Sequence, residues 1–226
     1  MEPLHILYED DFLIAIDKPA GMLVHANAKD DHPEWIAMKR LREQIGRRVF
    51  PIHRLDRPTS GVLLFALDKR TAGYLQQAFE QRKVTKTYLA IVSGIAPNQW
   101  RCDTALSDDS GATHRDAVTH FELIQTSPEA FFTSEPSLRL SLIKAMPETG
   151  RFHQIRRHLL ACGFPIVGDF RYAGQDRSFA LGELLGTGTR MLLQAKRLEI
   201  THPQSGERII IEAPGDEEFR KCFPWH

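Results

Sequence analysis

The chain has 226 residues, is 42% hydrophobic and carries a formal net charge of +0 at pH 7, which is enough apolar material for a single domain that can comprise two lobes. No apolar stretch approaches the roughly 18 residues of a membrane-spanning helix, and the N-terminus lacks the basic-then-apolar pattern of a secretory signal. The three cysteines are far apart and form no Cys-x-x-Cys pair, so the sequence predicts neither a zinc site nor a disulfide framework and favours a reducing cytoplasm.

The first half of the chain predicts an alternation of strands and helices. The expected elements are a hairpin over 5–16, a helix over 33–45, a strand over 62–67, a helix over 69–82 and a strand over 84–92. Pro33 suits the first turn of the first helix and Gly46 its end, whereas Asp68 is placed to cap the second helix. The strand over 62–67 is apolar throughout, which is typical of a strand covered on both faces.

The second half predicts more strands than helices. The expected elements are strands over 117–124 and 138–145, a helix from 151 that ends at Gly163, an irregular segment over 171–189, and strands over 191–193, 198–200 and 208–211. Strands and helices do not alternate as regular βαβ units. The pattern therefore predicts the α+β class rather than a doubly wound parallel sheet.

The segment from His53 to Gly61 has the strongest chemical signature. It places Asp56 between Arg54 and Arg57, before a Pro-Thr-Ser-Gly turn that leads into the apolar strand. Loops held by a rigid scaffold are where reactive groups tend to lie. Asp56 could serve as a nucleophile, as a base or as a plain salt-bridge partner. The structural alternative is that it caps the turn and pairs with Arg54 or Arg57.

Arg156 stands out on the helix that begins near residue 151. At 100° per residue Phe152, Ile155, Leu159 and Leu160 form one apolar stripe, and Arg156 falls inside it, while Gln154, Arg157 and His158 fall outside. A charge that faces the core is costly unless an opposite charge pairs with it. The sequence predicts a buried carboxylate partner, for which Asp56 is the candidate. The alternative is that Arg156 extends to the rim of a short helix.

Cations and one tyrosine suggest a nucleic-acid partner. Tyr88 shares a strand face with Lys86, and aromatic rings beside basic groups stack well on unpaired bases, although most strand tyrosines belong to the core. Residues 39–57 include seven basic and two acidic side chains. Residues 69–88 and residues 139–158 each include five basic side chains and one acidic side chain. These segments either converge into one RNA-binding patch or form three separate solvated faces.

Together these residues resemble the RluA-type pseudouridine synthases. The matching motifs are Lys18-Pro19-x-Gly21, His53-Arg54-Leu55-Asp56-x-x-Thr59-Ser60-Gly61, Lys86-x-Tyr88, Gly150-Arg151-x-His153-Gln154-Ile155-Arg156-x-His158 and Gly168-Asp169, in family order over nearly the whole chain. The resemblance implies an α+β pseudouridine synthase fold over 1–226, with a mixed, mainly antiparallel sheet, flanking helices and a catalytic cleft. It implies an isomerase that cuts a uridine of RNA at its glycosidic bond, turns the base and rejoins it through C5. It implies no cofactor and no metal.

The resemblance also assigns roles to five residues. Asp56 would be the essential carboxylate, acting either by addition to the ribose or base or by removing a ribose proton. Tyr88 would stack on the base and assist proton removal at C5. Arg156 would pair with Asp56, Ile155 would form an apolar wall beneath the base, and Arg54 would hold the everted nucleotide or fill the space that it leaves.

The expected substrate is tRNA. No S4-type RNA-binding domain is expected before the catalytic part, and the stretch 54–64 is most similar to the branch of the family that modifies uridine 65 of tRNA. The same chemistry on a ribosomal RNA uridine is one alternative, and a non-catalytic RNA-binding protein on this fold is another. We expect a cytoplasmic monomer with RNA as its partner, no membrane association and no obligate protein partner.

Overall fold

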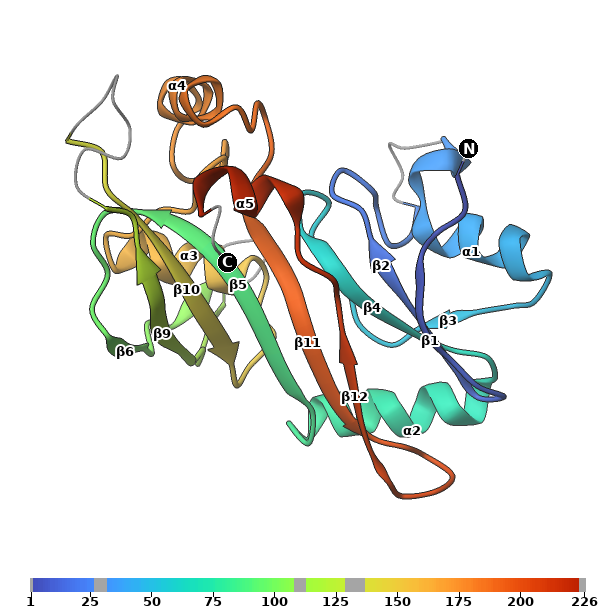
Figure 1. The fold of residues 1–226 in the computed structure, drawn as a ribbon. Coiled ribbons are helices and arrows are strands. Elements are labelled where there is room, and N and C mark those ends of the chain that lie inside the picture. Colours follow the sequence, from blue (N-terminus) through green and yellow to red (C-terminus); the bar gives the residue numbers. More distant parts are fainter. Residues whose placement is uncertain (1, 27–31, 108–112, 129–136, 224–226) are drawn as a thin grey trace. The chain divides into compact units, whose positions relative to one another are not determined.

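A computed structural model describes residues 2–26, 32–107, 113–128 and 137–223, and the chain divides into two compact units (Figure 1). Unit 1 comprises Met1–Lys86 and Ala195–Pro214, and unit 2 comprises Thr87–Gln194 and Gly215–His226. Each unit has its own hydrophobic core.

Strands form the framework of unit 1, and the pairs β1–β2, β2–β4, β3–β4 and β11–β12 are antiparallel. Their hydrogen-bonded order is β1-β2-β4-β11, with β3 paired to β4 and β12 paired to β11. The bounds are β1 Ile6–Glu9, β2 Leu13–Lys18, β3 Phe50–Pro51, β4 Ser60–Ala66, β11 Leu193–Thr201 and β12 Arg208–Glu212. Every residue of β4 is buried, which confirms the strand that the apolar run predicted.

In unit 1 the structure confirms the predicted start of α2 and the predicted end of α1. Helix α2 (Lys69–Glu80) begins after Asp68, whose carboxylate accepts a hydrogen bond of 2.9 Å from the backbone N–H of Thr71. Helix α1 (Ala37–Ile45) ends at Gly46, which has a φ of 66°. The predicted start at Pro33 is wrong for α1, because Pro33–Trp35 form a separate 3-10 turn, η1. Extended Ile36, which is bridged to Leu23, interrupts the helical hydrogen bonds.

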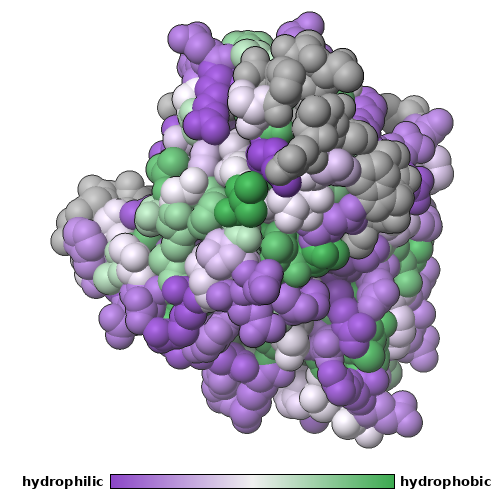
Figure 2. Space-filling model, turned by 60° about the vertical axis from the view of Figure 1, so that its left-hand side comes forward, coloured by the Kyte–Doolittle hydropathy of each residue, from purple (hydrophilic) through white to green (hydrophobic). Residues whose placement is uncertain are grey.

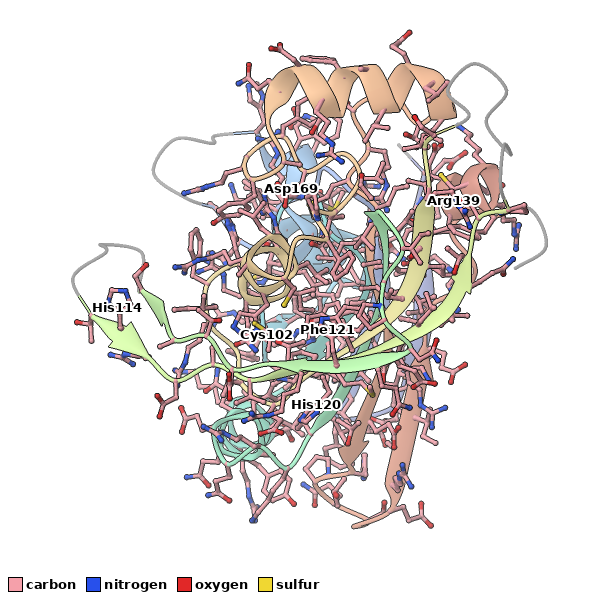
Figure 3. The ribbon with its side chains drawn as sticks, turned by 90° about the vertical axis from the view of Figure 1, so that its left-hand side faces the viewer. Cys102, His114, His120, Phe121, Arg139 and Asp169 are labelled. Atoms are coloured by element: carbon pink, nitrogen blue, oxygen red, sulfur yellow. The ribbon has the colours of Figure 1, made fainter. Side chains whose placement is uncertain are left out.

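Unit 2 contains a second run of antiparallel strands, in the order β5-β10-β9-β6, and a separate β7–β8 pair. The bounds are β5 Thr85–Ser93, β6 Gln99–Cys102, β7 Leu106–Ser107, β8 His114–Arg115, β9 Thr119–Thr126 and β10 Leu140–Pro147. Figure 3 labels Cys102 and Phe121 on the neighbouring strands β6 and β9. The mainly antiparallel strands and the few helices confirm the predicted α+β class.

Helices α3 (Gln154–Ala161), α4 (Gln175–Leu185) and α5 (Glu217–Cys222) complete unit 2. The prediction that 171–189 is irregular is wrong, because α4 occupies its middle. Its buried residues are Ser178, Gly182 and Leu185, so its inner face is mostly small and lacks the apolar periodicity by which helices are identified. A Cβ atom at Gly182 would lie 1.9 Å from the carbonyl oxygen of Gly188, so the close contact there requires glycine.

The face of the molecule drawn in Figure 2 is largely polar. In the view of Figure 2 most side chains are hydrophilic, and hydrophobic ones reach the surface as patches among them. Within the described ranges, no helix is both long and apolar enough to cross a bilayer.

Candidate active site

The Asp56 loop joins β3 to β4 within unit 1. The backbone N–H of Thr59 donates to the carbonyl oxygen of Asp56 at 3.0 Å and closes a turn through Arg57 and Pro58. Leu55 is buried, Asp56 is half-buried, and Arg54 is exposed. Buried Leu55 therefore anchors the loop in the core, and the polar side chains on either side of it, Arg54 and Asp56, extend toward the surface.

Lys18 fastens a second turn to this loop. Its side chain is 0% exposed, and Nζ donates to the carbonyl oxygens of Pro19 at 2.9 Å, Met22 at 2.8 Å and Arg57 at 3.3 Å. Gly21 and Arg57 share two further hydrogen bonds. The Gly21 N–H donates to the Arg57 carbonyl oxygen at 2.8 Å, and the Arg57 Nε donates to the Gly21 carbonyl oxygen at 3.0 Å. The buried ammonium of Lys18, the last residue of β2, thus holds the backbone at Arg57, next to Asp56. The Lys18-Pro19-x-Gly21 motif could be recognised in the sequence, but its role in holding the Asp56 loop could not.

His53 has a structural role at the start of the same motif. Its Nε2 accepts a hydrogen bond of 3.1 Å from the backbone N–H of Leu64, and its ring stacks on Phe79 at a centroid distance of 5.1 Å. Burial, with a contribution from the charge of Lys86, lowers the pKa of His53 to about 4. Neutral His53 therefore fixes the incoming segment to β4 near pH 7, because a protonated Nε2 could not accept this bond.

Gly61 marks the point where the loop enters β4. It has a φ of 103°, and a Cβ atom there would lie 2.2 Å from the carbonyl oxygen of Ala195. No side chain fits between these two backbones, so packing requires glycine at position 61.

Tyr88 and Ile155 belong to unit 2. Tyr88 lies on β5 opposite Ala145 of β10, and its half-buried ring packs against a core cluster that includes buried Ile155. Lys86 and Tyr88 are both half-buried residues of β5, and the prediction that they share one strand face stays a prediction. Burial, assisted by the charge of Arg82, lowers the pKa of Lys86 to about 8.

Arg156 is buried, with 5% of its surface exposed, as its place in the apolar stripe predicted. Its partner within unit 2 is Asp169: Nε donates to Oδ2 and Nη2 donates to Oδ1, both at 2.8 Å. Asp169, which Figure 3 labels in the segment between α3 and α4, is itself only 1% exposed. The requirement for a buried carboxylate is therefore met by Asp169, a residue that the sequence contained only as half of a weak Gly-Asp motif. The pairing of Arg156 with Asp56 stays a prediction.

The predicted orientation of α3 needs correction at its polar positions. Gln154 and His158, expected outside the apolar stripe, are buried, and Leu160, expected inside, is 40% exposed. Gln154 binds Thr149, Arg151, Val118 and Thr119 through its amide, and the His158 ring lies within hydrogen-bond distance of Thr119 and Thr104. Hydrogen bonds make burial of these polar groups tolerable, and they pin α3 to the strand β9.

The site residues predicted from the sequence thus fall into two groups. Arg54 and Asp56 lie on one loop of unit 1, whereas unit 2 holds Tyr88 on β5 and both Ile155 and Arg156 on α3. In the parts of the chain that the structure describes, no cluster of three His, Cys, Asp or Glu side chains is arranged to hold a metal ion.

Comparison with known proteins identifies the family. Residues 12–161 match the family of RNA pseudouridylate synthases. Two solved structures, titled Human RNA Pseudouridylate Synthase Domain Containing 1 and Domain Containing 4, both superpose with a TM-score of 0.75 and are 26% identical. The first match covers 95% of this chain and 86% of that one, and the second covers 97% and 92%.

Curated relatives align over nearly the full length. The chain is 41% identical to tRNA pseudouridine synthase C of Pasteurella multocida, over 98% of this chain and 97% of the relative. It is 42% identical to the protein of the same name from Haemophilus ducreyi, over 99% and 97%, and 39% identical to that of Salmonella typhimurium, over 98% and 90%. Sequence motifs, fold and relatives agree, and the chain belongs to the RNA pseudouridylate synthase family.

Proposed function

We propose that this protein isomerises one uridine of tRNA to pseudouridine, with Asp56 as its essential carboxylate. The observation that carries the choice of substrate is the alignment of proteins named tRNA pseudouridine synthase C over nearly all of this chain, at about 40% identity. The branch that the loop sequence resembles makes uridine 65 the expected position. Both units act together as one catalytic domain.

The reaction has three chemical requirements. The bond between N1 of uracil and C1′ of ribose must break, the base must turn, and a bond from C5 to C1′ must replace it with loss of the C5 proton. Asp56 supports the first step either as a nucleophile or as the base that removes a ribose proton. Its position on a loop anchored by Leu55 and by the Lys18 hydrogen bonds supports this role, because a catalytic group must be held in one place.

Unit 2 supplies surfaces suited to an everted uracil. The half-buried ring of Tyr88 offers a face for stacking and a phenol for proton transfer at C5. Ile155 provides an apolar wall, and the guanidinium of Arg156 is held rigidly by Asp169. Arg54 would contact the nucleotide or its phosphates, and its exposure on the Asp56 loop supports this role.

RNA binding draws on the basic segments. Removing a base from its stack costs a few kcal/mol, which contacts between cations and phosphates offset. Affinity for tRNA is therefore expected to fall as salt rises, and a flat salt response would contradict the role of these segments. We further propose that the enzyme works in the cytoplasm as a monomer that needs no obligate protein partner and no membrane.

Mapping pseudouridines in total RNA from cells that lack this protein tests the proposal. We expect one pseudouridine to disappear from tRNA, and the wild-type gene to restore it. If a pseudouridine disappears from ribosomal RNA instead, the substrate is ribosomal RNA and not tRNA. If purified protein forms no pseudouridine in any cellular RNA and its absence changes no site, the non-catalytic alternative is correct.

A further inference from the structure

Four residues form an aromatic and cationic cluster next to the Arg156–Asp169 pair, all within unit 2. The rings of Phe152 and His153 stack with centroids 3.7 Å apart, and His153 Nδ1 lies 3.0 Å from the hydroxyl of Tyr172. The guanidinium of Arg171 lies 5.4 Å from the centre of the Phe152 ring and 5.7 Å from that of Tyr172. We call these residues, Phe152, His153, Arg171 and Tyr172, the stacking cluster.

His153 adopts an unusual backbone conformation to take its place there. Two described residues other than glycine have positive φ: Arg82 at 58° and His153 at 50°. Arg82 follows the end of α2, where its own N–H and that of Lys83 close the helix, so its conformation is that of an ordinary C-terminal cap. His153 instead precedes α3, where extended backbone is usual, and its side chain makes no cap hydrogen bond. Backbone strain of this kind clusters at ligand sites, and here it directs an imidazole toward Tyr172.

Asp169 links the stacking cluster to Arg156. Its Oδ1 accepts from Nη2 of Arg156 at 2.8 Å and from the backbone N–H groups of Arg171 and Tyr172, both at 3.2 Å. The guanidinium of Arg156 lies 5.0 Å from the centre of the Tyr172 ring. The Asp169 carboxylate therefore fixes the position of Arg156, which is proposed for the uridine site, and also the position of the backbone that carries Arg171 and Tyr172.

The chemistry of the cluster matches an unpaired nucleobase. Arg171 is exposed, while Phe152, His153 and Tyr172 are half-buried, so planar groups reach solvent instead of filling the core. Unpaired bases of RNA stack on aromatic rings and on arginine planes without reading sequence. A core cluster would leave no exposed planar cation, and a simple phosphate contact would not need the rings.

We infer that the stacking cluster binds a second base of the RNA, one that neighbours the target uridine and has left its own stack. The inference rests on the proposed function, since Ile155 and Arg156, which lie on α3 shortly after Phe152 and His153, are assigned to the uridine itself. Stacking a neighbour offsets part of the cost of eversion and holds the strand in register.

Single-turnover rates with a tRNA substrate, at rising enzyme concentration, test this. Placing an abasic residue on one side of the target uridine should raise the half-saturating concentration of wild-type enzyme about tenfold. Arg171→Lys, which keeps the charge but loses the plane, should weaken binding of intact tRNA to a similar extent. The same abasic substitution should then cost this variant less than about twofold, because the stacking partner is already lost.

Arg177→Lys on α4 is the matched control, since Arg177 is exposed and stands outside the cluster. It should behave as wild type. Phe152→Leu, checked for a normal thermal unfolding transition, should reproduce the effect of Arg171→Lys. Arg171 is exposed, so its substitution leaves the test valid even if Phe152→Leu does not fold.

Two results would overturn the inference. In one, abasic residues on either side leave wild-type binding unchanged. In the other, the Arg171→Lys and abasic losses multiply independently, which indicates a phosphate contact. Both leave pseudouridine formation by the wild-type enzyme intact, whereas failure of the proposed function would remove that activity itself.

Discussion

Arg156 and Asp169 form a two-point ion pair in which both N–O distances are 2.8 Å and both side chains are almost fully buried. The guanidinium fork matches the carboxylate, so the pair fixes the orientation of Arg156 as well as its charge. Compensation of the buried charge therefore does not by itself require Asp56. A link between Arg156 and Asp56 must be tested through catalysis and not through stability.

Removal of Asp169 should destabilise the protein strongly. Asp169→Ala leaves the Arg156 charge without this partner, and loss of one member of a buried pair costs about 3–5 kcal/mol of unfolding free energy. Urea denaturation measures the change. Asp103→Ala is the control, because the Arg101–Asp103 pair has side chains 50% and 65% exposed and should contribute less than about 1 kcal/mol. Equal losses of unfolding free energy for the two substitutions would mean that the buried Asp169 pair stabilises the protein no more than an exposed pair does.

Asp56→Asn should abolish isomerisation and leave tRNA binding within about threefold of wild type, because the amide keeps the size of the side chain but has no charge or basicity to use in the reaction. Release of tritium from C5-labelled uridine measures turnover, and filter binding measures affinity. Asp11→Asn, at an exposed acid of the same unit, should be fully active. Normal turnover by Asp56→Asn would remove this residue from its proposed role.

Tyr88→Phe should lower the maximal rate by at least about tenfold and change affinity much less. The ring that stacks on uracil remains, while the phenol proposed for proton transfer is lost, and general acid–base groups typically contribute factors of about 100 or more. Single-turnover kinetics separate the two effects. Tyr74→Phe, at an exposed tyrosine of α2, serves as the control. A loss confined to affinity would contradict the proposed proton transfer.

Stability should decline as pH falls below about 6.5, in part because of His53. Its pKa is lowered from 6.5 to about 4 in the folded protein, so between these values the unfolded chain binds more protons and acid favours unfolding. The contribution of neutral His53 to the unfolding free energy is fully present above pH 6.5 and is lost by pH 4. Between these values it falls by up to roughly 1.4 kcal/mol per pH unit. Urea unfolding at several pH values measures the slope.

Because burial also lowers the pKa of His158, the informative quantity is the difference between wild type and His53→Gln. The variant should show a shallower acid slope, whereas His114→Gln, at an exposed residue of β8, should keep the wild-type slope. Identical slopes for all three proteins would show that His53 is not held neutral by the fold.

Local pattern was sufficient for most elements of the fold and for the nature of the candidate site. The Asp68 cap, the Gly46 stop and the buried strand β4 each depend on neighbours within a few residues, so they can be recognised in the sequence. Burial of Arg156 followed from helical periodicity in the same way. The motifs around Asp56, Tyr88 and Arg156 also pointed to the family that the comparisons identify.

Tertiary structure decided the contacts that join segments distant along the chain. Asp169 as the partner of Arg156, the Lys18 bonds to the Asp56 loop, and the burial of Gln154 and His158 against β9 have no local signature. Helix α4 escaped prediction because small residues, not a hydrophobic stripe, form its inner face. A polar side chain can be buried wherever the fold brings it a hydrogen-bond partner, and the linear order of residues does not say where that will be.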